Sequence, residues 1–414
     1  MKTFSVTCFA LILYFGAPAQ TFTQLLENGK DLIKKERGDK ASDKGNYLRA
    51  AITLEAALQM KPDDPEAHYF LGSAYDYENN ADCGEIINTR KGLAIAASNE
   101  FETVIRLQPN YTGEIIALDP VSKLYSIWGC LGFCYMVKGY EDSARWAFAE
   151  GKKRGAFGDF SLTYYRKLLH DCGPHAIYIS YGDFSIMNIW YLQAVEHYRT
   201  DVTAMNLNML YIPWVTEYYY KHDSSLFSSQ QVASDTTKYE EWEEQEVAIP
   251  IQSTGKKLKV PIKPTYYDRY LVRNDMVLLD MVQHNKFMRP LYFEKGSAPE
   301  AILMLNHYTA DRFIMDELVP KERPSPDKAF YDQFSIFPFQ LINTVNPHCS
   351  EDVRNVRGLR YEFIKAVYQL LAENKKADAR KLLAQMEQYI PVSQYSYEDP
   401  ALEGYVTDFH AKVK

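Results

Sequence analysis

The chain has 414 residues, of which 24% are charged, and a formal net charge of −8 at pH 7. A chain of this length can form two or three domains with a large buried core, and an aromatic content of 14% argues against disorder. Because the negative charge offers no basic field to a phosphate backbone, we do not expect a nucleic-acid partner.

Residues 1–19 have the three parts of a secretory signal peptide: the basic residue Lys2, the apolar run from Phe4 to Phe15, and the small-residue segment Ala17-Pro18-Ala19. We therefore expect cleavage after Ala19 and export to the periplasm or cell envelope. No other stretch approaches the length of about 18 apolar residues that crosses a bilayer, so no transmembrane span is predicted.

Five cysteines follow the predicted leader, and none of them forms a CxxC pair. An odd number without such a pair argues against a disulfide framework and against a zinc site. Cys130 and Cys134 are four residues apart on a predicted helix and flank Gly132, which favours small core residues. The sequence predicts no cofactor.

Residues 20–160 show a helical pattern that repeats, with large apolar, Leu-Gly, aromatic and Ala positions typical of tetratricopeptide repeats. About three repeats are predicted, with polar insertions near residues 79–92 and 111–120. The positions that fit the template best are Trp128, Leu131, Gly132, Tyr135, Ala144, Phe148 and Gly151, and further matches are His68, Leu71, Gly72, Tyr75, Ala97, Phe101 and Val104.

Such stacked helix pairs usually present a concave face that binds a peptide or protein. The first helix of each pair lines that face, which makes His68, Tyr69, Tyr75 and Tyr125 the candidates for partner contact. Tyr69 and Tyr125 lie off the packing template and are therefore expected to be the aromatic anchors. The alternative is that the arm only packs on the rest of its own chain.

Residues 161–320 are predicted to form a small Rossmann-like parallel sheet. An apolar run at Ala176–Tyr181, an amphipathic helix at Phe184–His197 and a second apolar run at Asp201–Leu210 have the order of a βαβ unit. Pro290–Phe293 is a third candidate parallel strand. The Pro-containing runs 248–251 and 258–262 predict an edge hairpin, and the acidic run Tyr239–Glu246 predicts a solvated surface, with a basic-partner site as the alternative.

The remaining third of the chain is less regular. Ala310–Leu318 fits either a helix or a strand, and residues 321–357 are predicted to be an irregular connection. Tetratricopeptide positions return at the end, so residues 358–414 are predicted to form a helical hairpin. The expected fold class is α plus α/β, with helical repeats flanking the sheet.

The amino-acid sequence of the α/β region also resembles that of a known family. From about Tyr164 to Pro400 it is similar to the soluble region that follows the membrane spans of a bacterial multi-spanning family related to protein O-mannosyltransferases. Phe184-Ser185 stand where that family continues its Gly-Asp turn with Asn-Asp. The segments that carry the resemblance are Gly182-Asp183, Trp190 to Glu196, Arg199 to Val202, Asn206 to Leu210, Leu279 to Met281, Arg289 to Phe293, Arg312 to Pro320 and Arg360 to Pro391.

Polar side chains follow the predicted parallel strands, where open sheets bind their ligands. These are Asp183 and Ser185 after the first strand, Asn206 and Asn208 late in the second, and Glu294 after the third. They could hold a sugar or a metal ion, although Asp183 is equally suited to cap the following helix. No established catalytic or metal-binding motif is present, so no catalytic residue is predicted.

Two functions follow from these patterns. The first is an exported, non-catalytic binding or scaffold protein whose arm holds a protein or peptide partner in the cell envelope. The second follows from the family resemblance, which implies a glycan-related accessory or enzyme domain that uses the crevice near Asp183.

Overall fold

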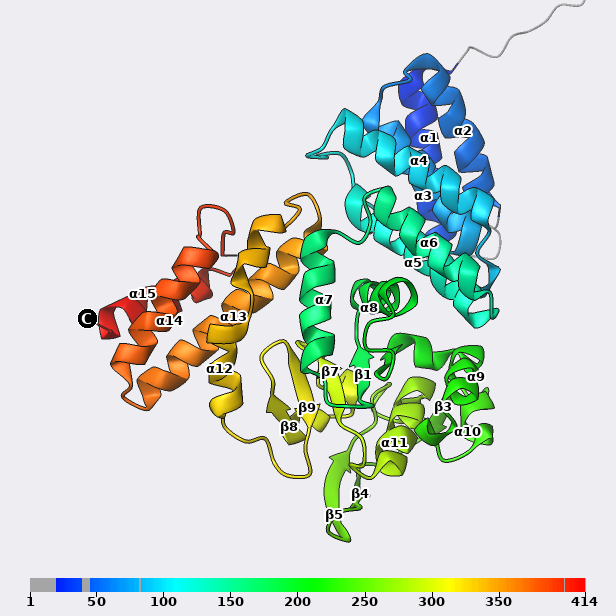
Figure 1. Ribbon diagram of the computed structural model, residues 1–414. Coiled ribbons are helices and arrows are strands. Elements are labelled where there is room, and N and C mark those ends of the chain that lie inside the picture. Colours follow the sequence, from blue (N-terminus) through cyan, green and yellow to red (C-terminus); the bar gives the residue numbers. More distant parts are fainter. Residues whose placement is uncertain (1–19, 39–44, 82, 398, 414) are drawn as a thin grey trace, which may run out of the picture.

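The computed structural model describes residues 20–38, 45–81, 83–397 and 399–413. It has a helical arm at one end, a sheet with its covering helices in the centre, and a second group of helices that ends with α15 (Figure 1). The predicted signal peptide lies outside the described residues. Within the described ranges no helix is both long and apolar enough to cross a membrane.

The arm consists of six helices, each packed against the next along the chain. Its turns follow from local sequence: Thr21 forms a capping box with Gln24, and Asp64 and Asp119 cap helices that begin at a proline. The two predicted insertions fall between helices. The helices are α1 (Phe22–Arg37), α2 (Asn46–Met60), α3 (Pro65–Asn80), α4 (Lys91–Leu107), α5 (Pro120–Val137) and α6 (Glu141–Lys153), with the short helix η2 (Ile86–Asn88) in the first insertion.

Glycines allow the arm's helices to approach closely. A Cβ atom at Gly132 would lie 2.5 Å from the Phe148 ring, and one at Gly151 would lie 2.5 Å from the side chain of Trp128. Both rings are fully buried. Large rings on one helix thus pack into gaps left by glycines on its neighbour, which is the physical reason for the repeated pattern.

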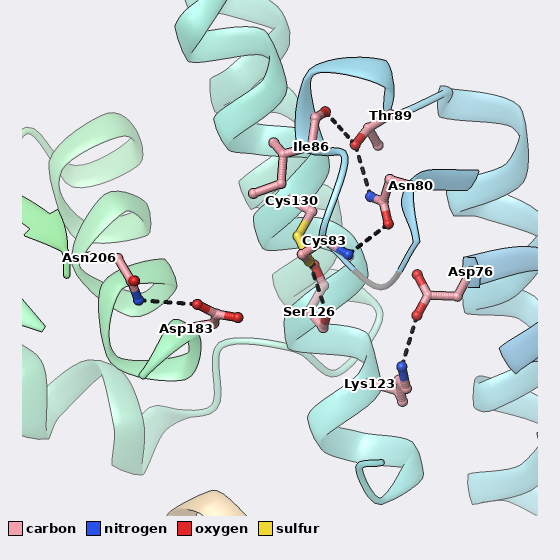
Figure 2. Close-up of a disulfide and its surroundings, with 10 residues drawn as sticks. All are labelled: Asp76, Asn80, Cys83, Ile86, Thr89, Lys123, Ser126, Cys130, Asp183 and Asn206. Atoms are coloured by element: carbon pink, nitrogen blue, oxygen red, sulfur yellow. Dashed lines mark hydrogen bonds and ion pairs between the residues drawn. A yellow bond between two sulfur atoms is a disulfide. The ribbon is translucent and has the colours of Figure 1, made fainter. Parts of the chain in front are cut away.

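A disulfide joins Cys83 in the first insertion to Cys130 on α5 (Figure 2). The prediction that the cysteines form no disulfide is wrong for this pair, because the insertion folds back across α5. Cys134, one helical turn further along, is buried and not oxidised, as expected for a small core residue. A structural disulfide is consistent with an oxidising compartment.

The central sheet has five strands in the order β2-β1-β7-β9-β8. The first three are parallel, and Ile177 of β1 lies opposite Thr203 on one side and Leu291 on the other. The predicted parallel strands are therefore confirmed, while β8 and β9 extend the sheet in an antiparallel sense. The strands are β1 (Ile177–Ser180), β2 (Thr203–Asn206), β7 (Leu291–Glu294), β8 (Thr309–Asp311) and β9 (Met315–Leu318).

Helices connect the sheet to the arm. The helix α8 contacts α5 and α6 of the arm as well as β1 and β2, and α7 packs beside it. The second strand is shorter than predicted, because the chain turns into a 3-10 helix directly after Asn206. These elements are α7 (Asp159–Asp171), α8 (Asp183–Glu196), η3 (Asn208–Tyr211), α9 (Pro213–His222), η4 (Ser224–Leu226), α10 (Gln230–Ser234) and α11 (Arg273–Asn285).

Two small antiparallel ribbons lie beside the central sheet. The predicted hairpin is present, but β4 and β5 pair only with each other among the described residues and do not extend the edge of the central sheet. The other ribbon joins β3 and β6. Their bounds are β3 (Tyr239–Glu241), β4 (Gln245–Ile251), β5 (Lys256–Ile262) and β6 (Tyr270–Val272).

The C-terminal helices lie beside α7 and the β8–β9 part of the sheet, on the side opposite α9 and α10 (Figure 1). The connection predicted to be irregular contains α12 and η7, and α13 begins at Ser350, before the predicted hairpin. Arg360 is buried and donates to the carbonyl oxygens of Ile390 and Tyr395, which fixes the end of α14. The elements are η5 (Glu300–Ile302), η6 (Leu305–Tyr308), α12 (Lys328–Ile336), η7 (Phe339–Thr344), α13 (Ser350–Ala372), α14 (Lys376–Tyr389) and α15 (Pro400–Lys412).

Candidate functional site

The five polar residues predicted to follow the strands do meet at the carboxyl edge of the sheet. Asp183 opens α8, Asn206 ends β2 and Glu294 ends β7. The Asn206 amide donates to a carboxylate oxygen of Asp183 over 3.1 Å, so the loop after β1 is joined to the end of β2 (Figure 2). The sheet topology has therefore brought these side chains together as the pattern indicated.

Glu294 occupies the position that an anion would take at the start of α8. Its Oε2 atom accepts the backbone N–H of Tyr181 at 2.6 Å and that of Gly182 at 3.0 Å. Its Oε1 atom accepts the hydroxyl of Ser185. A helix amino terminus favours negative charge, and here the protein itself supplies that charge. A second anion would be repelled from this position.

Asn206 and Asn208 have internal partners. The Asn206 side chain also accepts the backbone N–H of Met209 at 3.1 Å, and the Asn208 amide donates to the carbonyl oxygen of Tyr181 at 3.0 Å. Neither residue borders a cavity of this edge. The structure gives both a role in the turns, and it gives no support to their predicted contact with a ligand.

A cavity of about 680 Å³ opens beside Glu294, between the sheet and α13. Its walls come from segments that are distant in the chain: α7, the first and third parallel strands, the loops before β8, and α13. Aromatic rings form much of the lining, and polar groups are set among them. The lining includes Tyr164, Tyr165, Tyr178, Tyr181, Phe293, Phe313, Tyr361, Asn306, Arg323 and Arg354.

Among the described residues, two uncharged polar atoms at this cavity have no hydrogen-bond partner. The hydroxyl of Tyr178 is buried and unpaired, and so is the side-chain oxygen of Asn306. An unpaired buried polar group costs about 1–3 kcal/mol. Burial, reinforced by the nearby charge of Glu294, holds the pKa of Tyr178 well above its ordinary value. The Tyr178 hydroxyl is therefore neutral and can both donate to and accept from a bound molecule.

One wall of the cavity carries a network of charges. Lys295 donates to Asp311 at 2.6 Å and to Asp316 at 2.9 Å, and Lys365 bridges Asp311 and Glu362. Burial raises the pKa of Glu362 to about 7, although the two lysines oppose that rise. This wall therefore holds a carboxyl group that changes its protonation near neutral pH.

A smaller cavity of about 200 Å³ lies on the arm side of the same edge and is lined by Asp183, Tyr125 and Ser122. Gly182 and Arg354 border both cavities. The Arg354 side chain is 59% exposed and forms an ion pair with Glu351. Arg354 thus stands at the boundary between the two cavities.

The structure corrects the predicted partner-binding tyrosines of the arm. Tyr69 is buried because the second insertion folds over it: its hydroxyl donates to the carbonyl oxygen of Leu118 at 2.8 Å and accepts the N–H of Ile116 at 3.1 Å. Tyr125 is buried where α5 meets α8, with its ring 4.5 Å from that of Phe184. Neither side chain is available as an exposed anchor.

The other two arm candidates remain partly accessible but are engaged. His68 lies 2.5 Å from a carboxylate oxygen of Glu100, and its second nitrogen lies 2.8 Å from the carbonyl oxygen of Pro62. Tyr75 donates to Glu55 at 2.5 Å. Their contact with a partner stays a prediction.

Sequence reasoning missed most of the cavity. Tyr178 lies on a predicted strand, but nothing in the strand pattern shows that its hydroxyl lacks a partner. Arg354 comes from the connection predicted to be irregular, and Asn306 lies in a stretch to which neither a strand nor a helix was assigned, so the sequence pattern does not place either side chain. Within the described ranges no cluster of three or more His, Cys, Asp or Glu side chains is arranged to hold a metal ion.

The central region matches a known family model. Residues 162–263 and 249–333, which overlap, match the model described as TMEM260-associated domain 2. The match begins in α7 and ends in α12, so it contains the whole central sheet and both ribbons. The arm and α13 to α15 lie outside it. No curated protein matches the chain.

Proposed function

We propose that this chain is an exported, non-catalytic binding protein that holds a carbohydrate in the cavity between the sheet and α13. The observation that carries the proposal is the pair of unpaired buried atoms, the Tyr178 hydroxyl and the Asn306 oxygen, among aromatic rings. Sugar hydroxyl groups can donate to and accept from such atoms, while aromatic rings cover the apolar face of a sugar ring.

The chemistry of the walls supports a hydroxyl-rich ligand. An apolar molecule would leave the Tyr178 and Asn306 atoms unpaired and so retain their cost. Charged groups of both signs border the cavity, among them Glu294, Asp316, Arg323 and Arg354, so the lining does not select a ligand of one charge. A neutral sugar can pair with the Tyr178 and Asn306 atoms and needs no charged partner.

The resemblance of the matched region to proteins related to O-mannosyltransferases supports the same class of ligand. The matched region contains β1 and β7, which supply Tyr178 and Glu294, and its resemblance to proteins related to O-mannosyltransferases connects it to glycans. The predicted leader and the disulfide support export. In this proposal the domain binds a glycan as an accessory module, and α13 completes its site.

The test is titration of the protein with neutral sugars, namely mannose, glucose, galactose, N-acetylglucosamine and their disaccharides, followed by calorimetry. We expect one of them to bind and Tyr178→Phe to weaken that binding about fivefold to tenfold, the effect of one neutral hydrogen bond. Tyr331→Phe is the matched control, because its hydroxyl is also buried and unpaired but lies outside the cavity. Absence of binding by the wild-type protein, or equal loss in both variants, would contradict the proposal.

A second candidate function is a protein-binding arm. The outer side of α2 carries three exposed apolar side chains, Leu48 (54%), Ile52 (60%) and Met60 (53%), at multiples of four residues and hence on one face of the helix. Crosslinking in the native envelope should capture a partner through this face. Leu48→Gln with Ile52→Gln should abolish the capture at an unchanged melting temperature. Recovery of nothing above background would count against the arm.

A further inference from the structure

The ribbon formed by β3 and β6 has one open edge. The backbone N–H of Trp242 donates to Arg269 at 2.8 Å and that of Arg273 to Lys238 at 2.9 Å. In an antiparallel ladder the bonded pairs alternate, so the N–H and C=O groups of Tyr239 and Glu241 point away from β6. All three residues of β3 are exposed to solvent, and the strand therefore presents an unpaired edge that another strand can join.

The opposite edge of the ribbon is already covered. The turn after β5 folds back on β6, where Tyr266 and Tyr270 exchange two backbone hydrogen bonds of 3.0 Å. The tip of this turn is formed by Tyr267 and Asp268, both with positive φ. A bulky residue rarely adopts a positive φ. The side chain of Tyr267 at this tip is 80% exposed.

Tyrosine rings gather beside the open edge. The rings of Tyr239 and Tyr266 are nearly parallel, with centroids 6.0 Å apart, and the Tyr267 ring lies 4.3 Å from that of Tyr266. Tyr239 also lies 5.9 Å from Tyr270 on the neighbouring strand. An exposed cluster of this kind is typical of a binding surface, because aromatic side chains dominate the energetic centres of interfaces.

The surface already binds one guanidinium group from its own chain. Arg269 lies over the Tyr270 ring at 5.2 Å and forms a 2.5 Å ion pair with Glu241. Tyr239 and Tyr267 offer the same kind of ring face. Glu240 and Glu243 offer the same kind of carboxylate, and within the described parts of the chain neither forms an ion pair. The unused groups therefore favour a positively charged occupant.

We infer that the edge of β3 is a docking site for an extended, positively charged segment of a partner protein. The segment adds a strand to β3 through the backbone of Tyr239 and Glu241, the mode of recognition known as β-augmentation. Its Arg or Lys side chains contact the tyrosine rings and the glutamates of the run Tyr239–Glu246. This surface is separate from the cavity, and the inference does not depend on the carbohydrate proposal.

The experiment measures binding of a fluorescent peptide with alternating Arg and Thr residues to the full protein by anisotropy. We expect binding that weakens as salt concentration rises, and no binding of a matched Glu/Thr peptide. Glu241→Pro removes a backbone donor that faces the open edge and also the carboxylate that pairs with Arg269, so Glu241→Gln is its control for the lost charge. Glu241→Pro should bind at least about tenfold more weakly than Glu241→Gln. Glu240→Gln with Glu243→Gln should weaken binding about threefold to tenfold and reduce its dependence on salt.

Matched variants separate docking from general effects. Glu141→Gln with Asp142→Asn changes the net charge equally on exposed positions of the arm and should leave the affinity unchanged. An unchanged melting temperature shows that each variant is folded. Equal binding of the Glu/Thr peptide, full binding by Glu241→Pro, or a dimer of the protein that Glu241→Pro dissociates in ultracentrifugation would each overturn the inference.

Discussion

Buried polar groups compared between the arm and the cavity differ in whether they have a partner in the chain. In the arm, the Lys123 ammonium pairs with Asp76 at 2.9 Å in an almost inaccessible position (Figure 2), and the Trp128 N–H donates to Ser98 at 2.9 Å. At the cavity, the hydroxyl of Tyr178 is equally buried but has no partner in the fold. Groups that satisfy each other hold helices in register, whereas in our proposal the unpaired hydroxyl of Tyr178 is available to a bound sugar.

The largest expected effect comes from breaking the buried ion pair of the arm. Asp76→Asn leaves the Lys123 charge without its counter-charge, and we expect the free energy of unfolding to fall by about 3–5 kcal/mol. Denaturant titration followed by circular dichroism measures this loss. The control Asp142→Asn removes an exposed pair with Arg145 and should cost less than about 1 kcal/mol. Equal losses of unfolding free energy in the two variants would mean that the buried pair contributes no more than an exposed one.

Removal of the disulfide should come next. Cys83→Ala with Cys130→Ala releases the first insertion from α5, and we expect a loss of about 2–4 kcal/mol, measured as a lower melting temperature. Reductant should lower the melting temperature of the wild-type protein and leave that of the double variant unchanged. A melting temperature insensitive to reductant would show that the bond does not form in the protein.

Protonation of the cavity wall should make stability depend on pH. The pKa of Glu362 is raised from 4.5 to about 7 in the folded protein, so the folded state holds this proton more tightly than the unfolded chain. Its stabilising contribution is complete below pH 4.5 and is lost as the pH rises to 7. One pKa unit corresponds to about 1.4 kcal/mol, so the change is on the order of 3 kcal/mol.

Glu362→Gln should therefore flatten the dependence of unfolding free energy on pH between 4.5 and 7. Denaturant titrations at the two pH values provide the measurement. Burial also raises the pKa of Asp352 to about 6, so part of the slope should remain in the variant. A slope identical to that of the wild type would show that Glu362 titrates normally.

Replacement of one buried tyrosine by phenylalanine in each region compares the arm with the cavity directly. Tyr69→Phe removes a hydroxyl that makes two hydrogen bonds to the second insertion, and we expect a loss of about 1–2 kcal/mol in denaturant titration. If Tyr69→Phe proved neutral, the insertion would not be held by this side chain.

Tyr178→Phe should have the smallest effect on stability. Its hydroxyl has no partner among the described residues and its burial is unfavourable, so without ligand the variant should lose no stability and should gain about 1 kcal/mol. Calorimetric melting with and without the bound sugar is the measurement. A large loss without ligand would mean that the hydroxyl is satisfied within the fold, and the contrast between the regions would disappear.

Local patterns predicted the parts of this fold that depend on local physics. In the segments predicted to form parallel strands, the apolar side chains are buried, among them Ile177, Ile179, Val202, Met205, Leu207 and Leu291. The apolar runs identified the parallel strands, and the Leu-Gly and Ala positions identified the paired helices. A helical period specifies the paired helices, and a short continuous apolar run specifies a strand that is buried on both faces.

The parts that failed depend on contacts between distant segments. Tyr69 is covered by an insertion that carries no period, and Tyr125 by the docking of α8 on α5. Cys83 lies in a polar insertion, and the spacing of the cysteines in the sequence does not show that this insertion crosses α5. β8 and β9 are too short to show an alternation. The edge residues could be grouped because strand ends meet, but the cavity needed α13, which no sequence rule places opposite the sheet.

The carboxylate of Glu294 also has a consequence for the order of folding. It binds the amides of Tyr181 and Gly182, more than a hundred positions earlier in the chain. Contacts between residues so far apart in sequence form slowly, because the long intervening loop must close before the hydrogen bonds can form. In contrast, each arm helix packs on its immediate neighbour in sequence. The arm is therefore expected to mature first, and the start of α8 to remain an unfilled anion-binding terminus until β7 docks beside β1.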